Sequence, residues 1–332
     1  MAKAVLFDEL GGPEVLRLDE VALGEPGKGE VRMRVDAIGL NRAESLFRSG
    51  SYIYQPDLPG SRLGYEAAGV VEAVGDGVHG FAAGDAVSTV PSFRMTEYGT
   101  YGDAAVLPAR ALVGRPDGVD AVTGAATWMA YTTAYGLLVE VGGIDPGDVV
   151  LITAASSSVG LAAIQVANHL GAVPVATTRT GAKRRRLLEA GAAHVIATQE
   201  QDLVEEVRAV TGGRGVELAV DPVAGPGVNT LIQAVAPDGA LLLYGFLDPA
   251  PVPMPIAPDF RGRTVRTYLF EEITVDSEPR LRRAKHFIDA GLRAGSLAPV
   301  VDRAFDLAEV VEAHHHLESG AQFGKIVLTV RH

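Results

Sequence analysis

Two patterns of hydrophobic and polar positions divide the chain. In its first part, short runs of strand-forming residues such as Glu30–Ala37 and Ala67–Val74 are separated by Gly, Asp and Pro. Further on, fully apolar runs such as Asp148–Thr153 and Val173–Thr178 alternate with helical ones. The first pattern is typical of a compact antiparallel barrel or sandwich. The second is typical of a parallel sheet buried on both faces by helices, the doubly wound dinucleotide-binding arrangement.

The second pattern predicts individual elements along the rest of the chain. The expected strands are His194–Ala197, Val216–Asp221 and Ala240–Tyr244. The expected helices are Val159–Leu170, Ala182–Ala190, Gln201–Thr211 and Gly227–Ala236. The last part returns to a mixed character, with helices expected over Glu278–Ala294 and Leu307–Ser319 and a closing strand over Lys325–Val330.

Composition and charge narrow the function classes. With 332 residues and 47% hydrophobic content, the chain is long enough for about two packed domains. The net charge of −12 argues against a nucleic-acid partner, and no run approaches the ~20 apolar residues of a membrane span. The absence of cysteine excludes disulfides, cysteine zinc sites and a thiol nucleophile. Acids appear too early in the N-terminal segment for a signal peptide, so we expect a soluble cytoplasmic protein.

A turn of small residues joins the strand at Asp148–Thr153 to the next helix. Small side chains let backbone N–H groups approach a pyrophosphate, and the helix N-terminus adds about half a positive charge. Ala155, Ser157 and Gly160 stand at the three positions of the G-x-G-x-x-G fingerprint. A serine-capped strand–helix turn is the alternative, but the surrounding β-α-β pattern favours a dinucleotide. The candidate cofactor-binding residues here are Ala155, Ser156, Ser157, Ser158, Val159 and Gly160.

The end of the following strand favours NADPH over NADH. Enzymes that use NAD usually place Asp or Glu about 20 residues after the turn, to hold the ribose 2′-hydroxyl. This chain has no acid there and continues into a basic run. A 2′-phosphate favours cations and hydroxyl donors. Thr178, Arg179 and Lys183 are therefore candidate contacts, whereas Arg185 and Arg186 are expected on a solvated helix face.

Five motifs in order carry a resemblance to a known family. They are Gly39-Leu40-Asn41-Arg42-Ala43-Glu44, the segment from Gly60 through Gly64-Tyr65-Glu66-Ala67-Ala68-Gly69-Val70-Val71, Gly80-Phe81-Ala82-Ala83-Gly84-Asp85-Ala86-Val87, the turn Ala154–Gly160, and Phe323-Gly324-Lys325-Ile326-Val327-Leu328. With them the chain resembles the medium-chain dehydrogenase/reductase superfamily over essentially its whole length, and within it the zinc-independent quinone oxidoreductase and enoyl reductase branch. The resemblance implies an α/β protein with a GroES-like, β-rich substrate domain (1–123 and 268–332), a Rossmann cofactor domain (124–267), and a homodimer.

The chain departs from the zinc-dependent members of this superfamily. Those members bind catalytic zinc through Cys, His and Cys, and the matching positions here are Asn41, Tyr65 and about Met129. None of these side chains is a good zinc ligand, so we expect no catalytic metal. The run His314-His315-His316 is no substitute, because consecutive residues of a helix diverge by ~100° and cannot converge on one ion.

Without a Lewis acid, the enzyme must polarise its acceptor by hydrogen bonds or use an acceptor that needs little help. Tyr52 matches the tyrosine that enoyl-thioester reductases place near the substrate, where a phenol stabilises an enolate or delivers a proton; the alternative is an aromatic residue that only packs. Asn41 is expected to hold the carbonyl or the cofactor's ribose, or to form only an Asx-turn. Tyr65 is a further candidate, and it and Tyr54 alternatively line the pocket.

The resemblance adds cofactor contacts. Thr133 matches a threonine that contacts nicotinamide, the alternative being a buried helix hydroxyl bonded to backbone. Lys325 is expected to reach the cofactor or to be a surface charge. Ligands bind at the C-terminal ends of strands in open α/β sheets. On that ground the remaining candidates are Asp221, Tyr244, Gly245 and Phe246.

These observations favour an NADPH-dependent, zinc-free oxidoreductase that transfers hydride to a quinone or an α,β-unsaturated carbonyl compound. One alternative is an enoyl-thioester reductase in a biosynthetic pathway. A second is an NADPH-binding structural or sensing protein with little turnover. The serine-containing turn, which departs from the glycine fingerprint, is compatible with this alternative. The apolar segment near Thr264–Phe270 is a candidate for pairing at a sheet edge in the homodimer.

Overall fold

The computed structural model describes residues 1–253 and 261–332 and divides the chain into two compact units. Unit 1 comprises Met1–Met129 and Pro299–His332, and unit 2 comprises Ala130–Ala298. The sequence-based boundaries placed residues 268–298 in the first domain instead. The helices α8 (Glu271–Thr274) and α9 (Glu278–Ala294) pack within unit 2, where Arg283 of α9 donates two hydrogen bonds to Glu140 (2.7 and 2.9 Å). No helix of the described residues is long and apolar enough to cross a membrane.

Unit 1 is built mainly of antiparallel strands in two sheets. The smaller sheet has the order β2-β1-β4, and the larger has the order β15-β16-β3-β5-β6-β8, with β7 paired to β3. The strand bounds are β1 (Ala2–Phe7), β2 (Arg17–Val21), β3 (Glu30–Gly39), β4 (Ser61–Arg62), β5 (Glu66–Val74), β6 (Ala86–Thr89), β7 (Ala104–Pro108), β8 (Leu112–Gly114), β15 (Val301–Asp306) and β16 (Lys325–Thr329).

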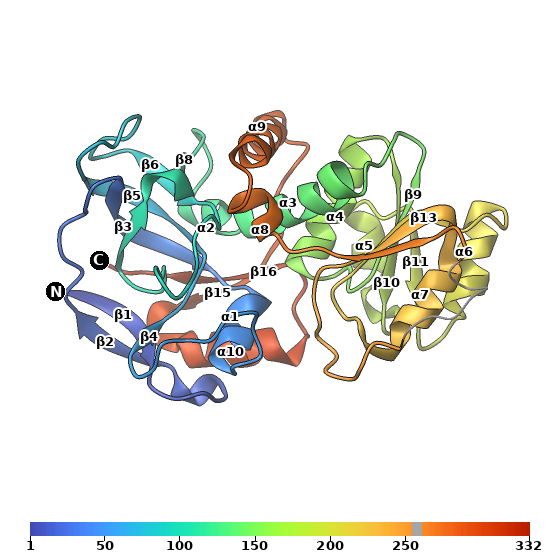
Figure 1. Cartoon of the computed structure of the whole chain (residues 1–332), viewed down its shortest axis with the longest axis horizontal. Coiled ribbons are helices and arrows are strands. Elements are labelled where there is room, and N and C mark those ends of the chain that lie inside the picture. The colour runs from blue at the N-terminus through green and yellow to red at the C-terminus, as the bar shows by residue number, and fades with distance from the viewer. Residues whose placement is uncertain (254–260) are drawn as a thin grey trace. The chain divides into compact units, whose positions relative to one another are not determined.

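The C-terminal strand β16 joins the N-terminal part of unit 1. It pairs antiparallel with β3, so that Val327 lies opposite Gly39 and the residues after β3 lie beside the start of β16. The short helix α1 (Arg42–Arg48) follows β3 directly and packs against α10 (Val310–Ser319), as Figure 1 shows. The helix α2 (Ala121–Ala125) packs on β3 and β5. This strand order brings residues 41–44, 65–66 and 325 together.

Unit 2 is the predicted doubly wound domain. Its six strands are all parallel, in the order β11-β10-β9-β12-β13-β14. The strand bounds are β9 (Val149–Ile152), β10 (Val173–Thr178), β11 (His194–Ala197), β12 (Val216–Asp221), β13 (Val235–Leu243) and β14 (Thr264–Thr267). The helix bounds are α3 (Trp128–Tyr135), α4 (Ser158–His169), α5 (Arg184–Glu189), α6 (Leu203–Thr211) and α7 (Val228–Ala234), α3 beginning in unit 1.

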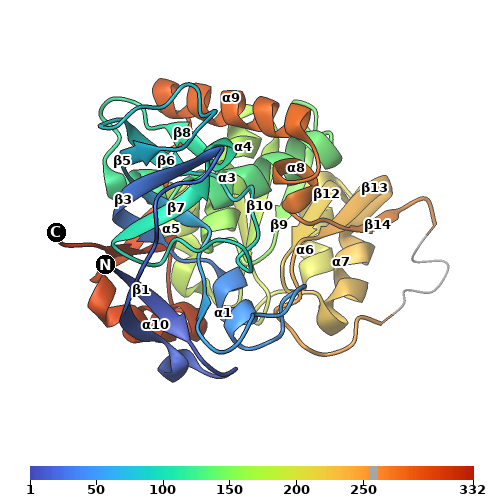
Figure 2. The ribbon, with the colours of Figure 1, turned by 60° about the vertical axis from the view of Figure 1, so that its left-hand side comes forward.

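Helices cover the sheet of unit 2, as its apolar strands require. The helices α6 and α7 lie side by side (Figure 2) and share a hydrophobic core with strands β9–β13. Most elements begin and end within two residues of the prediction, and β10 and α9 occupy the predicted residues. The helix predicted over Gly227–Ala236 is wrong at its end, because β13 begins at Val235 and pairs there with Val216. The α/β fold with a Rossmann sheet and a second, β-rich domain is confirmed.

Candidate active site

The turn between β9 and α4 has the geometry of a nucleotide-binding loop. Ser157 caps α4, since its Oγ accepts a hydrogen bond from the Gly160 N–H at 3.1 Å. A Cβ atom on Gly160 would lie 2.6 Å from the Cα of Ala155, so α4 approaches the turn as closely as it does only because residue 160 is glycine. This is the role of the third glycine in the dinucleotide fingerprint. The turn therefore keeps the close helix approach although Ala155 and Ser157 stand at the positions of the other two glycines.

One of the predicted basic residues lies at this turn. The Nζ of Lys183 donates to the Oγ of Ser156 at 3.1 Å. Arg179 is exposed in the loop after β10, and Thr178 ends that strand. Arg184 has a structural role, because its guanidinium donates hydrogen bonds to Val195 O (2.7 Å) and to the side chain of Gln201. Exposed Arg185 pairs with Glu189 along α5, as expected for a solvated helix face.

Asp221, at the end of β12, holds its own turn together. Its carboxylate accepts hydrogen bonds from the Thr153 hydroxyl and from the N–H groups of Val223 (3.1 Å) and Ala224 (2.6 Å). Burial raises its pKa, and these bonds act in the opposite direction. The next strand ends at Leu243, followed by Tyr244, whose pKa burial also raises, by Gly245 and by half-exposed Phe246. Thr133 is buried in α3.

Asn41 and Glu44 are bonded to each other at the start of α1. Glu44 Oε2 accepts the Asn41 backbone N–H (2.6 Å), and Oε1 accepts from Asn41 Nδ2 (3.1 Å). The Tyr65 N–H also donates to Oε1 at 3.3 Å. Glu44 is fully buried, which raises its pKa to about 7, although the charge of Lys325 and the Asn41 bonds lower it. The side chain of Glu44 thus ties two of the predicted site residues together.

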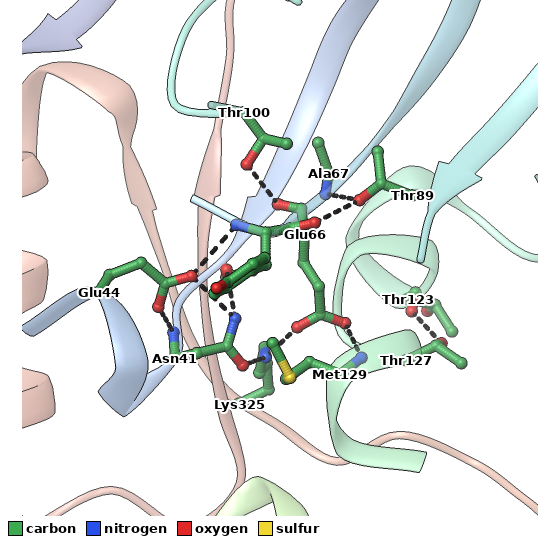
Figure 3. Close-up of polar contacts among 12 residues, drawn as sticks. Asn41, Glu44, Glu66, Ala67, Thr89, Thr100, Thr123, Thr127, Met129 and Lys325 are labelled. Atoms are coloured by element: carbon green, nitrogen blue, oxygen red, sulfur yellow. Dashed lines mark hydrogen bonds and ion pairs between the residues drawn. The ribbon is translucent and has the colours of Figure 1, made fainter. Parts of the chain in front are cut away.

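Lys325 completes this buried cluster (Figure 3). Its ammonium donates to Asn41 Oδ1 at 2.6 Å and forms an ion pair with Glu66, and both charged side chains are 1% exposed. The other oxygen of Glu66 accepts the Met129 N–H at 2.7 Å. A Cβ atom on Gly39 would lie 2.0 Å from Ala125 O and 2.8 Å from Lys325 Cε, so glycine is needed here chiefly for the approach of α2 and also leaves room for the lysine stem. The alternative that Lys325 is a surface charge is wrong.

We call the residues Asn41, Glu44, Glu66 and Lys325 the buried polar cluster. Asn41 and Lys325 were predicted from the sequence as site residues, whereas Glu44 and Glu66 were not. The signal for Glu44 was available, because Asn41 followed three residues later by Glu44 has the spacing of a capping box. Glu66 is a single acid inside the otherwise apolar start of β5, a pattern that signals a buried partner. Its partner, 259 positions away, could come only from the fold.

Three tyrosines place their hydroxyls together beside this cluster. Tyr65 is fully buried, and its Oη contacts both Tyr54 Oη and Tyr52 Oη, the latter at 3.4 Å. The Met95 N–H donates to Tyr54 Oη at 3.3 Å. The rings of Tyr52 and Tyr54 lie edge to face, 4.9 Å apart. The three predicted catalytic residues, Asn41, Tyr52 and Tyr65, therefore all lie in one region of unit 1.

The histidine run of α10 diverges as expected. His314 is buried against Arg48, His315 pairs with Glu14, and His316 pairs with Asp302. No group of three or more His, Asp or Glu side chains suited to a metal ion occurs among the residues that the structure describes.

Comparison with known proteins identifies the family. Residues 27–131 match the alcohol dehydrogenase GroES-like domain, and residues 158–283 match the zinc-binding dehydrogenase family. The chain is 32% identical to a 2-haloacrylate reductase from a Burkholderia species, with 99% of each chain covered. It is 29% identical to human quinone oxidoreductase, over 99% of this chain and 98% of that protein. The chain belongs to the medium-chain dehydrogenase/reductase superfamily, in its quinone oxidoreductase branch.

Solved structures agree with this assignment. Quinone oxidoreductase from Escherichia coli, solved in complex with NADPH, superimposes with a TM-score of 0.89 at 29% identity, covering 99% of this chain and all of that one. The structure of a 2-haloacrylate reductase gives a TM-score of 0.84 at 30% identity, with 99% of each chain covered.

The zinc of other members of the superfamily does not fit this chain. At the three positions that match zinc ligands, Asn41 accepts from an ammonium group, Tyr65 has its hydroxyl among phenols, and Met129 offers at most a thioether. Both nearby carboxylates already accept N–H donors. The buried charge of Lys325 would also repel a dication. The donor set therefore disfavours zinc.

Proposed function

We propose that this chain is a zinc-free, NADPH-dependent reductase of quinones or α,β-unsaturated carbonyl compounds. The observation that carries the proposal is the buried polar cluster, which includes Asn41 and whose two glutamates accept the backbone N–H groups of Tyr65 and Met129, the other positions that match zinc ligands. A site that disfavours zinc leaves the polarisation of the acceptor to hydrogen bonds. Full-length similarity to quinone oxidoreductases and to a 2-haloacrylate reductase supports both acceptor classes. When bound, NADPH would supply the hydride.

The turn Ala155–Gly160 would hold the pyrophosphate at the N-terminus of α4. Lys183, already at this turn, and Arg179 and Thr178 would face the 2′-phosphate, because cations and hydroxyl donors complement it. The ends of β12 and β13, with Asp221 and Tyr244–Phe246, remain predicted cofactor contacts. Thr133 remains a predicted contact to the nicotinamide.

The hydrogen bonds of Asn41 favour one of its two predicted roles. Its Nδ2 donates to Gly39 O (3.3 Å) and to Glu44, and its Oδ1 faces the Lys325 ammonium. The orientation of the amide is determined, because an ammonium only donates and a carboxylate accepts. A substrate carbonyl needs a donor, whereas a ribose hydroxyl is satisfied by the remaining lone pair of Oδ1. We infer that Asn41 holds the cofactor's ribose and that Lys325 acts through Asn41.

Tyr52 would then interact with the acceptor. Hydride addition leaves negative charge on the acceptor's oxygen, and a phenol O–H stabilises that charge and delivers the proton. The Tyr52 side chain is partly exposed and packs edge to face on Phe47 at 6.4 Å between ring centroids, which orients it. Tyr65 would support Tyr52 from inside the fold.

The first test is a titration with NADPH and NADH, followed by 9,10-phenanthrenequinone, 2-chloroacrylate, a simple enone and a crotonyl thioester. We expect selective NADPH binding, and oxidation of NADPH with the quinone or an activated alkene. Lys183→Ala should weaken NADPH binding about tenfold and leave NADH binding nearly unchanged, whereas the control Arg185→Ala should change neither. Turnover only with the thioester would indicate an enoyl-thioester reductase. Binding without any turnover would contradict the reductase and favour a sensing role.

We also propose that the chain forms a homodimer through β14. This strand is at the end of the sheet of unit 2 and pairs with β13 on one side. Three of its four residues are exposed. An edge strand in that position offers backbone N–H and C=O groups for pairing with a second copy.

A further inference from the structure

The contacts among Tyr54, Tyr65 and Tyr52 are compatible with one order of donors. The Met95 N–H can only donate, so Tyr54 Oη accepts from it at 3.3 Å. The Tyr54 O–H can then donate to Tyr65 Oη. The Tyr65 O–H can donate in turn to Tyr52 Oη, 3.4 Å away. In this arrangement the donors follow one another from Met95 to Tyr52.

We propose that Tyr65 and Tyr54 are positioning residues that form a hydroxyl relay to Tyr52. This inference rests on the proposed function, in which Tyr52 gives a proton to the acceptor. Each phenol that accepts a hydrogen bond becomes a stronger donor to the next, because successive hydrogen bonds polarise one another. The relay would therefore make the Tyr52 O–H a better acid than an isolated phenol.

The surroundings of Tyr65 suit this role. Its side chain is fully buried, with its ring 5.6 Å from that of Phe93, so its hydroxyl is held in place by packing. Burial raises its pKa far above the ordinary range, which keeps the phenol protonated. Tyr52 and Tyr54 at the two ends are partly exposed. The buried hydroxyl of Tyr65 thus connects the hydroxyls of two partly exposed side chains.

The proton balance of the step is simple. Reduced nicotinamide provides two electrons and one hydrogen to the acceptor as hydride, and the charge moves to the acceptor's oxygen. The Tyr52 O–H bond breaks as its proton passes to that oxygen. The Tyr65 proton moves to Tyr52 as the Tyr54 proton moves to Tyr65, so that no charge stays on the buried phenol, and water returns a proton to Tyr54. The three phenols end as they began.

The relay predicts a difference between acceptors. Hydride addition to a quinone gives an aromatic hydroquinone anion, which needs little help from an acid. Addition to an enone gives an enolate, which needs more. Tyr65→Phe should therefore lower kcat for the enone about tenfold, the factor expected for one lost hydrogen bond, and change quinone turnover much less. NADPH affinity should stay unchanged.

The experiment is a double-mutant cycle with Tyr52→Phe, Tyr65→Phe and the double variant, measured with both acceptors. Tyr52→Phe should lower enone kcat about 100-fold, and adding Tyr65→Phe should cost no more, because the relay acts only through Tyr52. In mixtures of H2O and D2O, the parent rate should depend on deuterium fraction along a curve, since more than one proton moves, and that of Tyr65→Phe along a straight line. The control is Tyr98→Phe, whose hydroxyl bonds to Glu30 and whose ring packs on Phe93.

Each other outcome overturns the relay. Equal losses from Tyr65→Phe with and without Tyr52 would give Tyr65 a separate, structural role. Parent rates in a folded Tyr65→Phe, with a slow Tyr52→Phe, would sink the relay and leave the proposed function standing. If the parent protein reduces no acceptor, both the relay and the proposed function are contradicted. If Tyr65→Phe fails to fold, Tyr54→Phe replaces it in the experiment. The relay then requires that Tyr54→Phe lower kcat for the enone by a smaller factor, and that this loss disappear in the Tyr52→Phe background.

Discussion

At the scale of the residue, the charge of Lys325 is expected to be important for the stability of the fold. Its ammonium is buried with Glu66 and Asn41, out of reach of water. Lys325→Met removes the charge, keeps much of the volume and leaves the Glu66 carboxylate buried without its cation. We expect a loss of about 3–5 kcal/mol in the free energy of unfolding, the usual cost of breaking a buried ion pair from one side. Urea denaturation measures it.

Glu66→Gln in the Lys325→Met background is the matched control. It removes the unpaired charge while an amide oxygen can still accept the Met129 N–H. We expect the double variant to be more stable than Lys325→Met alone, because the residual penalty is no longer ionic. A single variant as stable as the parent would show that the pair contributes nothing.

The buried polar cluster also shows what sequence reasoning could not reach. The importance of Asn41 and Lys325 was visible because each lies in a recognisable motif. The atoms that they contact could not be predicted, because Lys325 and Glu66 meet only once β16 has paired with β3 beside β5. Likewise, Tyr52 was singled out by its position in the chain, but the convergence of three phenols depends on where the loop after α1 lies in space.

At the scale of the element, the turn between β9 and α4 depends on Gly160. A methyl group there would be 2.6–2.8 Å from backbone atoms of Ala155, so Gly160→Ala must move α4 or the turn. We expect NADPH binding to weaken at least about tenfold, because the amides at the helix start lose their alignment. Gly227→Ala is the control, since nothing lies within 4 Å of a Cβ atom at that glycine. Isothermal titration of both variants decides, and equal affinities would contradict the argument.

The packing of α10 on α1 should respond to pH. Arg48 of α1 faces the Nδ1 of His314 at 3.3 Å, so that nitrogen must be the unprotonated acceptor. Burial first, and then the Arg48 charge, lower the pKa of His314 to about 3. The unfolded chain therefore takes up this proton near pH 6.5 and the folded one only near 3. Stability is then fully present above about pH 6.5 and is lost as the pH falls, by up to about 1.4 kcal/mol per pH unit.

The test compares the parent with His314→Asn by urea denaturation between pH 7 and pH 4. We expect the variant to be less stable at pH 7 but to have a shallower slope, because asparagine does not titrate in this range. His315→Asn, on the exposed side of the same helix, should keep the parent's slope. An unchanged slope in His314→Asn would assign the acid sensitivity to other groups.

The elements themselves were largely predictable. The strands of unit 2 are buried on both faces, so they are continuous apolar runs that can be recognised in the sequence. The helix α9 was predicted at its observed residues. The error at the end of α7 arose because Val235 and Ala236 are apolar and suit a helix as well as a strand. Only pairing with β12 decides between the two. Local propensity gives way to the sheet at such junctions.

At the scale of the whole molecule, sequence motifs established the order of the parts, whereas the extent of each unit depended on long-range packing. The strand β16 was predicted as a closing strand, and it pairs with β15 and β3 in unit 1. The helix α9 was assigned to the first domain because the sequence from about residue 268 returns to a mixed character. It belongs to unit 2 because Arg283 binds Glu140 and Phe287 packs on Tyr135, contacts that no linear pattern reveals.

The proposed homodimer can be tested at the edge of unit 2 without breaking its sheet. The Tyr268 N–H donates to Leu243 O at 2.8 Å, facing β13. Because alternate residues of a strand face opposite sides, the N–H of Val265 points away from β13. Proline at that position would remove an outward donor and leave the ladder to β13 intact. We expect Val265→Pro to be a folded monomer by light scattering, whereas the parent and Val265→Ala have twice the 34.7 kDa chain mass. A dimeric Val265→Pro would place the interface elsewhere, and a monomeric parent would exclude the homodimer.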